Sequence, residues 1–180
     1  MPTAARERLL ATAERLFYAE GIRAVGVERL LAESGVGRAS FYRHFPGKGD
    51  LVVTVLGQRL ARWRANLAAA VDARGGGVLA VFDVLADQAA EPGFRGCAAI
   101  NAMVETADAD SAAHHVAAAH KEHLAAYLQT LTGDEERARD LLLLVDGALV
   151  TSLRDPEAIP RARRVAEHVL RPTSGTSVGS

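Results

Sequence analysis

The apolar residues of this chain recur at the three- and four-residue spacing of amphipathic helices, and no stretch shows the alternation typical of a strand. In the first such segment five apolar side chains share one stripe: Leu9, Leu10, Ala13, Leu16 and Phe17. The remaining positions hold many good helix formers, such as Ala, Arg and Glu. The pattern predicts an all-α fold of about nine helices.

Glycine, proline and short polar runs mark where these helices end. The clearest break is Gly75-Gly76-Gly77, and Thr3 is a plausible N-cap for the first helix. The expected helices span about 3–20, 27–34, 38–44, 48–73, 78–90, 97–107, 111–131, 135–153 and 157–170. The tail, residues 172–180, is rich in Ser, Gly and Thr, so we expect it to be disordered.

The segment 27–45 combines two short expected helices with a tight turn, which is the geometry of a helix-turn-helix. Gly35 supplies the left-handed backbone that a sharp turn requires, and Val36 is placed to fill the corner. Phe41 and Phe45 lie four apart and are expected to point inward together. The opposite face carries short, basic or hydrogen-bonding groups that suit the major groove of DNA: Arg38, Ala39, Ser40, Tyr42, Arg43 and His44.

Lys48 stands in the first turn of the next expected helix, where a positive charge opposes the helix dipole. A phosphate at that helix end would explain its position, because the free backbone amides and the lysine would hold the anion together. The alternative is that Lys48 points into solvent at a small cost. Tyr42 and His44 are expected at the same corner, which favours the phosphate.

The charge is divided unevenly along the chain, although the net charge is only −1. The first 64 residues carry eleven Lys and Arg against six Asp and Glu, whereas the remainder carries ten against sixteen. This division favours a polyanionic partner for the first third of the chain. Surface charge that is merely uneven is the alternative.

Two segments, RERLLATAERLFYAEG and VERLLAESGVGRASFYRHFPGKGDL, resemble the N-terminal domain of the tetracycline-repressor (TetR) family of transcription regulators. The resemblance covers about residues 6–51. It implies a homodimer that binds palindromic double-stranded DNA and releases it when a small-molecule effector enters the C-terminal domain. By the same resemblance Tyr42, His44 and Lys48 contact phosphates, and Arg38, Ala39 and Ser40 approach base edges. Repression, rather than activation, is the family's usual mode.

The sequence departs from the family pattern at several positions. Gly26 stands where the family usually has a capping Thr or Ser, and Leu31 replaces a small alanine. These departures keep a second hypothesis open, an all-helical small-molecule-binding protein or enzyme with a degenerate DNA-binding head. Catalysis itself finds little support, because the chain has no nucleophile elbow, no phosphate-cradling loop and no paired-histidine zinc motif. We expect neither enzymatic activity nor a cofactor.

The later helices predict a dimer interface. Residues 141–153 are apolar nearly all round, so the helix they form is expected to be buried on two sides, one of them by a second subunit. The candidate interface residues are Leu141, Leu144, Ala148, Val165 and Val169. A central core helix in a monomer is the alternative. We therefore expect a DNA-binding domain over residues 1–47 and a ligand-binding and dimerisation domain over residues 48–171.

A polar line predicts the effector pocket. Cys97, Asn101 and Glu105 recur every four residues on one helix face, as polar groups in ligand pockets do. Possible apolar walls are Leu60, Trp63 and Phe94. Polar residues that simply face solvent are the alternative. The segments 94–105 and 141–148 resemble one branch of the same family. The later helices hold few aromatic residues to line a pocket, which suggests an apolar effector of modest size.

The remaining features concern compartment and metals. Cys97 is the only cysteine, so no intrachain disulfide forms, and no apolar run is long enough to cross a membrane. The N-terminus lacks the order of a signal peptide, so we expect a cytoplasmic protein. Four histidines lie close in sequence but without an acidic or thiolate partner at ligand spacing, so we expect them to face solvent and to bind no metal: His114, His115, His120 and His123.

Overall fold

The computed structural model describes residues 4–106 and 108–171, and over these residues the chain forms nine α-helices and no strand. The predicted fold class is confirmed. The helices are α1 (Ala4–Glu20), α2 (Val27–Ser34), α3 (Arg38–His44), α4 (Lys48–Asp72), α5 (Val78–Ala90), α6 (Ala98–Thr106), α7 (Ala112–Thr132), α8 (Glu135–Thr151) and α9 (Ala158–Val169). The expected helix α8 ended at residue 153, two residues later than observed. The predictions for Thr3, position 107 and the tail 172–180 lie outside the described residues.

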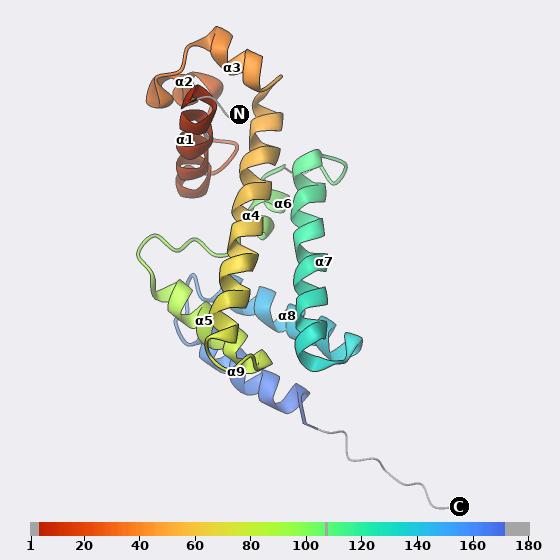
Figure 1. The fold of residues 1–180 in the computed structure, drawn as a ribbon. Coiled ribbons are helices and arrows are strands. Elements are labelled where there is room, and N and C mark those ends of the chain that lie inside the picture. The colour runs from red at the N-terminus through yellow and green to blue at the C-terminus, as the bar shows by residue number, and fades with distance from the viewer. Residues whose placement is uncertain (1–3, 107, 172–180) are drawn as a thin grey trace, which may run out of the picture.

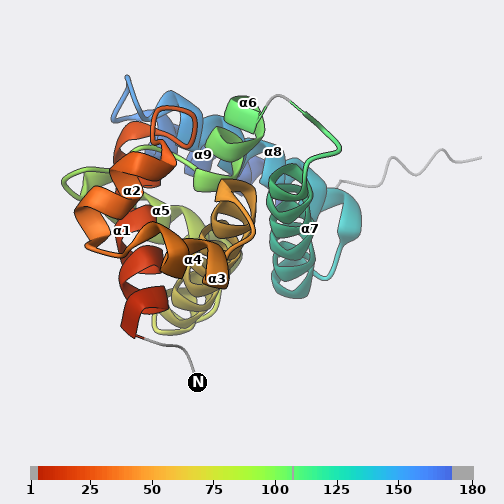
Figure 2. The same ribbon diagram turned by 90° about the horizontal axis from the view of Figure 1, so that it is seen from above.

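Helix α4 is the axis of the molecule. Helices α1, α2 and α3 form a head around its N-terminal end, and α5, α8 and α9 gather around its far end (Figure 1). Helix α7 runs beside α4 on the side away from α1 (Figure 2). A rotation of α4 would therefore move the head relative to the rest of the chain.

Two apolar cores lie along this axis. The first fills the head, where Leu9, Leu16, Leu30 and Phe41 are fully buried, and continues along α4 to Ala102 of α6 and to α7. The second joins the far half of α4 to α5, α7, α8 and α9. The head thus shares its apolar core with α6.

Helix α8 buries one face in its own subunit and leaves the other open. Leu141 and Ala148, both predicted at the dimer interface, fill the second core and offer no surface to another subunit. Leu143, on the opposite face, is 73% exposed, so α8 is not buried all round within this chain. Leu144 and Val169 are half-buried, and Val165 is exposed.

Candidate nucleic-acid interface and effector pocket

The turn between α2 and α3 has the backbone that a helix-turn-helix needs. Gly35 has φ 64° and ends α2, with its N–H donated to the carbonyl of Leu31 at 3.0 Å. Val36 is buried in the corner. Phe41 and Phe45 of α3 point inward, with ring centroids 6.2 Å apart. The expected packing of this segment is confirmed.

The outer face of α3 is largely exposed to solvent. Tyr42 is 49% exposed and stands edge-on to the Phe41 ring. Arg38, Ala39 and Arg43 are exposed, whereas Ser40 and His44 are half-buried. The structure brings two of the predicted residues together, because Nη2 of Arg43 donates to Oγ of Ser40 at 3.1 Å. Hydroxyl, guanidinium and phenol groups therefore share one surface.

Arg38 is paired within its own head. Its guanidinium donates to the carboxylate of Glu28 on α2, and this carboxylate raises the pKa of Arg38 above its ordinary value. Glu28, the second residue of α2, was not among the residues predicted to act at this surface. Since Glu28 is negative and exposed, it offsets part of the positive charge on this surface of the head.

Lys48 lies at the junction of the head with α6. It is half-buried, and burial lowers the pKa of its amine, while the Glu105 carboxylate opposes part of that shift. Oε2 of Glu105 accepts a hydrogen bond from the backbone N–H of Arg23 at 3.0 Å, in the turn between α1 and α2. Gly21, with φ 95°, leaves room for this carboxylate, because a Cβ there would lie 2.9 Å from Oε2. A residue predicted to line the effector pocket thus also holds the head.

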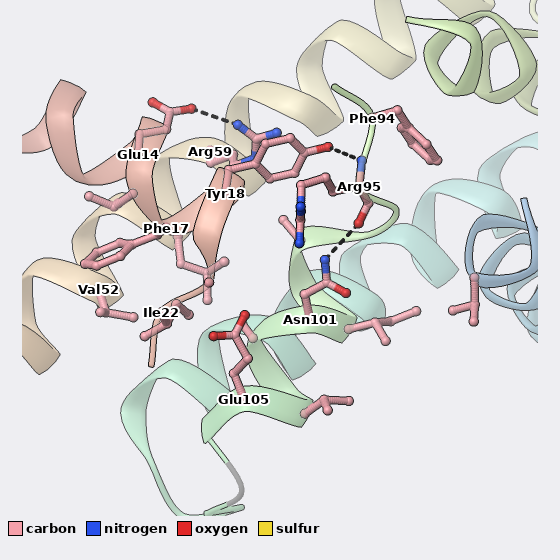
Figure 3. A pocket seen from close by; sticks show the side chains of 18 of the residues that line it. Glu14, Phe17, Tyr18, Ile22, Val52, Arg59, Phe94, Arg95, Asn101 and Glu105 are labelled. Atoms are coloured by element: carbon pink, nitrogen blue, oxygen red, sulfur yellow. Dashed lines mark hydrogen bonds and ion pairs between the residues drawn. The ribbon is translucent and has the colours of Figure 1, made fainter. Parts of the chain in front are cut away.

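A cavity of about 550 Å³ separates the head from α6 (Figure 3). Of the predicted pocket residues, Phe94, Asn101 and Glu105 line it. Apolar side chains form most of its walls. One side comes from α1, the following turn and α4, and includes Phe17, Ile22 and Val52; the other comes from α6 and the end of α8, and includes Ile100, Val104 and Val150. This volume suits a small organic ligand.

Hydrogen bonds beside this cavity join the connection between α5 and α6 to α1 and to α6. Tyr18 of the head accepts a hydrogen bond from the backbone N–H of Arg95 at 3.0 Å. Nδ2 of Asn101 donates to the carbonyl of Arg95 at 2.9 Å. The Arg59 guanidinium lies 3.7 Å from the centre of the Tyr18 ring and 3.2 Å from the Glu14 carboxylate. Sequence analysis missed Tyr18 and Arg95.

A second cavity of about 290 Å³ lies farther along α4 and holds the other predicted pocket residues, Leu60, Trp63 and Cys97. Nε1 of Trp63 donates to Oε1 of Gln88 at 2.9 Å. The six predicted residues therefore do not line one pocket. Asn101 and Glu105 line the larger cavity, Leu60, Trp63 and Cys97 line the smaller one, and Phe94 lines both.

His120 also lines the second cavity, so the expectation that it faces solvent is wrong. It lies on the buried stripe of α7 with Ala117 and Leu124. Arg64 can only donate, so the 3.1 Å contact of Nη1 with Nδ1 makes Nδ1 the acceptor and places the proton on Nε2. Burial, aided by nearby Lys121, Arg64 and His123, lowers the pKa of His120 to about 3. The ring is neutral at physiological pH.

Cys97 contacts Lys121, which also pairs with Asp146. Nζ of Lys121 lies 3.3 Å from Sγ of Cys97 and 2.5 Å from Oδ1 of Asp146, which joins the start of α6 to α7 and α8. Among the described residues, no group of three or more His, Cys, Asp and Glu could hold a metal ion. Over the same residues, no helix is long and apolar enough to cross a membrane.

Residues 9–55 match the family model described as bacterial regulatory proteins of the tetR family. The repressor DrrR1 of Streptomyces coeruleorubidus is 38% identical over 55 residues, 31% of this chain and 20% of that protein. The regulator LmrA of Bacillus subtilis is 33% identical over 69 residues, 38% of this chain and 37% of that protein. The chain thus matches well under half the length of these two relatives.

The likeness to a solved structure extends much farther. SCO4454, a TetR-family transcriptional regulator from Streptomyces coelicolor, superposes with a TM-score of 0.82 and is 39% identical. The match covers 95% of this chain and 90% of SCO4454, so both the head and the later helices are shared. This chain therefore belongs to the TetR family of helix-turn-helix transcription regulators.

Proposed function

We propose that this protein is a homodimeric transcription repressor that leaves a palindromic operator when a small molecule enters the cavity between the head and α6. The observation that carries this proposal is the pair of hydrogen bonds beside that cavity, Tyr18 with Arg95 and Glu105 with Arg23. Both join the head to the segment containing α6. A ligand that displaced either contact would alter the position of the head.

DNA binding is assigned to the outer face of α3. Arg38, Ala39 and Ser40 at its start would approach base edges in the major groove, and Arg43 would reinforce them. Tyr42, His44 and Lys48 would contact phosphates. Because the proposed partner is double-stranded DNA, we propose that the protein works in the cytoplasm. Relatives named as repressors and regulators support this role.

Dimerisation is assigned to the exposed apolar face of α8 and α9. The exposed apolar side chains of these two helices include Leu143, Val150 and Val165, and Leu144 and Val169 are half-buried. Val150 also lines the larger cavity. A soluble subunit gains by covering such side chains, and a twofold axis would bring the same face of a second subunit against them. Two heads are then available for two half-sites about 34–36 Å apart or a multiple of that spacing.

Effector action requires a difference in affinity. A ligand that binds both arrangements of the head equally shifts nothing, so the effector must favour the arrangement that does not fit the operator. The cavity supports such a preference because α1 and α6 form facing parts of its wall. Opening it further would separate the head from α6 and expose Phe17 and Ile22 to the ligand. We propose that the protein binds this ligand without transforming it.

Fluorescence anisotropy with DNA from upstream of the protein's own gene tests the proposal. Wild type should bind in a salt-dependent manner, and Lys48→Ala and Tyr42→Phe should each weaken binding to every sequence. Lys48→Ala should reduce the salt slope by about one. Arg171→Ala, which removes an exposed charge at the far end of α9, is the control and should bind as wild type does. Binding to no genomic fragment would favour a small-molecule-binding protein with a degenerate head.

A further inference from the structure

Arg95 is the charged residue of the larger cavity whose side chain has no carboxylate partner among the described residues. It lies in the connection between α5 and α6, and its side chain extends into the cavity near Asn101 (Figure 3). Its backbone is fixed on both sides, because the N–H is donated to Tyr18 and the carbonyl accepts from Asn101. The main chain of Arg95 is thus fixed beside the cavity, while its exposed side chain carries five N–H donors that a ligand can use.

The other charges of the cavity are already engaged. Glu14 accepts from Arg59 at 3.2 Å and also from Arg62. Glu105 accepts from the backbone N–H of Arg23 and lies close enough to Lys48 to affect its pKa. A cationic ligand would compete with Arg59 and Arg62 for Glu14. At Glu105 it would share the carboxylate with the Arg23 N–H and lie near the positive charge of Lys48. An anionic ligand would meet Arg95 without displacing any of them.

We propose that the cavity binds an amphipathic carboxylate, with its apolar body against Phe17, Ile22, Val52 and Leu56 and its anionic group on Arg95. A guanidinium pairs with a carboxylate through two parallel hydrogen bonds, which fixes the orientation of the ligand as well as its charge. This inference rests on the proposed effector role of the cavity and adds the chemical class of the effector. It also makes Arg95 the residue that selects the class.

The position of Arg95 gives the ligand a route to the head. The same residue offers its guanidinium to the ligand and its N–H to Tyr18 of α1. A carboxylate that shifts the Arg95 side chain within the cavity therefore pulls on a peptide that contacts the head. Asn101 of α6 donates a hydrogen bond to the carbonyl of Arg95. A pull on the Arg95 side chain would therefore act either on the hydrogen bond to Tyr18 or on α6.

Isothermal titration calorimetry of the whole protein without DNA, near neutral pH, tests the ligand class. The probes are decanoate, decan-1-ol and decylamine, which share one alkyl chain and differ in charge. We expect decanoate to bind at least about tenfold more tightly than decan-1-ol, and decylamine to bind more weakly than either. In Arg95→Gln the advantage of decanoate over decan-1-ol should disappear, while decan-1-ol should bind as it does to wild type. Arg171→Gln, an equal change of charge at the end of α9, should retain the advantage.

Three results would overturn the inference: decan-1-ol or decylamine binding at least as tightly as decanoate, an unchanged preference in Arg95→Gln, or no binding by any probe. The effector role is tested separately, by adding each probe to the complex of protein and operator DNA. If decanoate binds through Arg95 and the DNA stays bound, the ligand class stands and the proposed effector role fails. If the protein binds no DNA, the calorimetry still decides the ligand class.

Discussion

The hydroxyl of Tyr18 in α1 accepts a hydrogen bond from the backbone N–H of Arg95 at 3.0 Å, across 77 residues of sequence. Its ring also lies beneath the Arg59 guanidinium of α4, 3.7 Å from ring centre to Cζ. One side chain of the head thus contacts both the long helix and the connection that leads into α6. Under the proposed mechanism, a shift of the cavity wall at Arg95 would act on the head through Tyr18.

Tyr18→Phe should remove the hydrogen bond and keep the ring beneath Arg59. The free energy of unfolding should fall by about 1 kcal/mol, the usual net value of one such bond. The Arg95 amide should exchange with solvent faster, which hydrogen-exchange measurements on the two proteins would show. Unchanged exchange at Arg95 would mean that the hydrogen bond does not hold this connection to the head.

Glu28→Gln should strengthen DNA binding about threefold at low salt. The substitution removes a negative charge beside the binding face and releases Arg38 from its ion pair. The gain should shrink as salt rises, because exposed charges are screened. Glu135→Gln, which breaks a comparable exposed pair with Arg139 on α8, should leave DNA affinity unchanged. Weaker binding by Glu28→Gln would instead show that Glu28 orients Arg38 for DNA.

Gly26→Ser should stabilise the head by a few tenths of a kcal/mol. Gly26 is the N-cap of α2, its backbone is extended at φ −82° and ψ 164°, and no side chain caps the helix. Nothing lies within 4 Å of a Cβ placed there, so serine fits and its oxygen can accept from the first turn. Gly26→Ala is the control, since it fits the same space but cannot cap. Thermal unfolding should therefore rank serine above glycine and glycine above alanine.

The helix ends could be predicted because glycine and proline stand at most of them, as Gly35, Gly77 and Gly133 do. For a helix that is apolar nearly all round, the face that becomes buried could not be predicted. Leu141 and Leu143 are the same residue type two positions apart, and only the packing against α7 and α9 shows that Leu141 is the buried one. Which face of α8 is left exposed could therefore be seen only in the structure.

The pocket was predicted in part for a similar reason. Helical spacing identified Asn101 and Glu105 on α6, but Arg95 lies in a connection where no periodicity applies. His120 could have been found, because it continues the buried stripe of Ala113, Ala117 and Leu124 on α7. The neighbouring histidines obscured that stripe. Contacts between distant segments, such as Glu105 with Arg23, leave no pattern in a single sequence.

His120 should make the protein less stable as pH falls below about 6.5. The unfolded imidazole takes up a proton near that pH, whereas the folded one stays neutral until its pKa of about 3, so the unfolded state binds more protons between these values. Between pH 6.5 and 5 the free energy of unfolding should therefore fall by about 2 kcal/mol. The loss is complete only below pH 3.

His120→Asn is the variant that isolates this effect. An asparagine oxygen can stand in for Nδ1 as the acceptor from Arg64, and it does not titrate. Urea unfolding at pH 7 and pH 5 should show a smaller loss of stability in the variant than in wild type, by about 2 kcal/mol. The comparison uses the change between the two pH values, because the lost contact with Trp63 lowers stability at both. Equal losses in the two proteins would show that His120 does not carry the effect.

Leu143→Glu should convert the proposed dimer to a folded monomer. Leu143 is 73% exposed in the subunit, so glutamate there costs the fold of one subunit little. In a dimer the same carboxylate would lie between two apolar faces without a partner, which costs far more. Light scattering at micromolar concentration should give twice the subunit mass for wild type and the subunit mass for the variant. The thermal unfolding of the variant should still be cooperative.

Ala126→Glu is the matched control for this test, because it places the same charge at an exposed position of α7 and should remain dimeric. The monomeric Leu143→Glu should also lose most of its affinity for an operator with two half-sites while it retains weak binding to one, because each subunit carries a single reading head. A wild-type protein that is monomeric at micromolar concentration would remove the dimer proposal. A dimeric Leu143→Glu would place the interface elsewhere than the face formed by Leu143, Val150 and Val165.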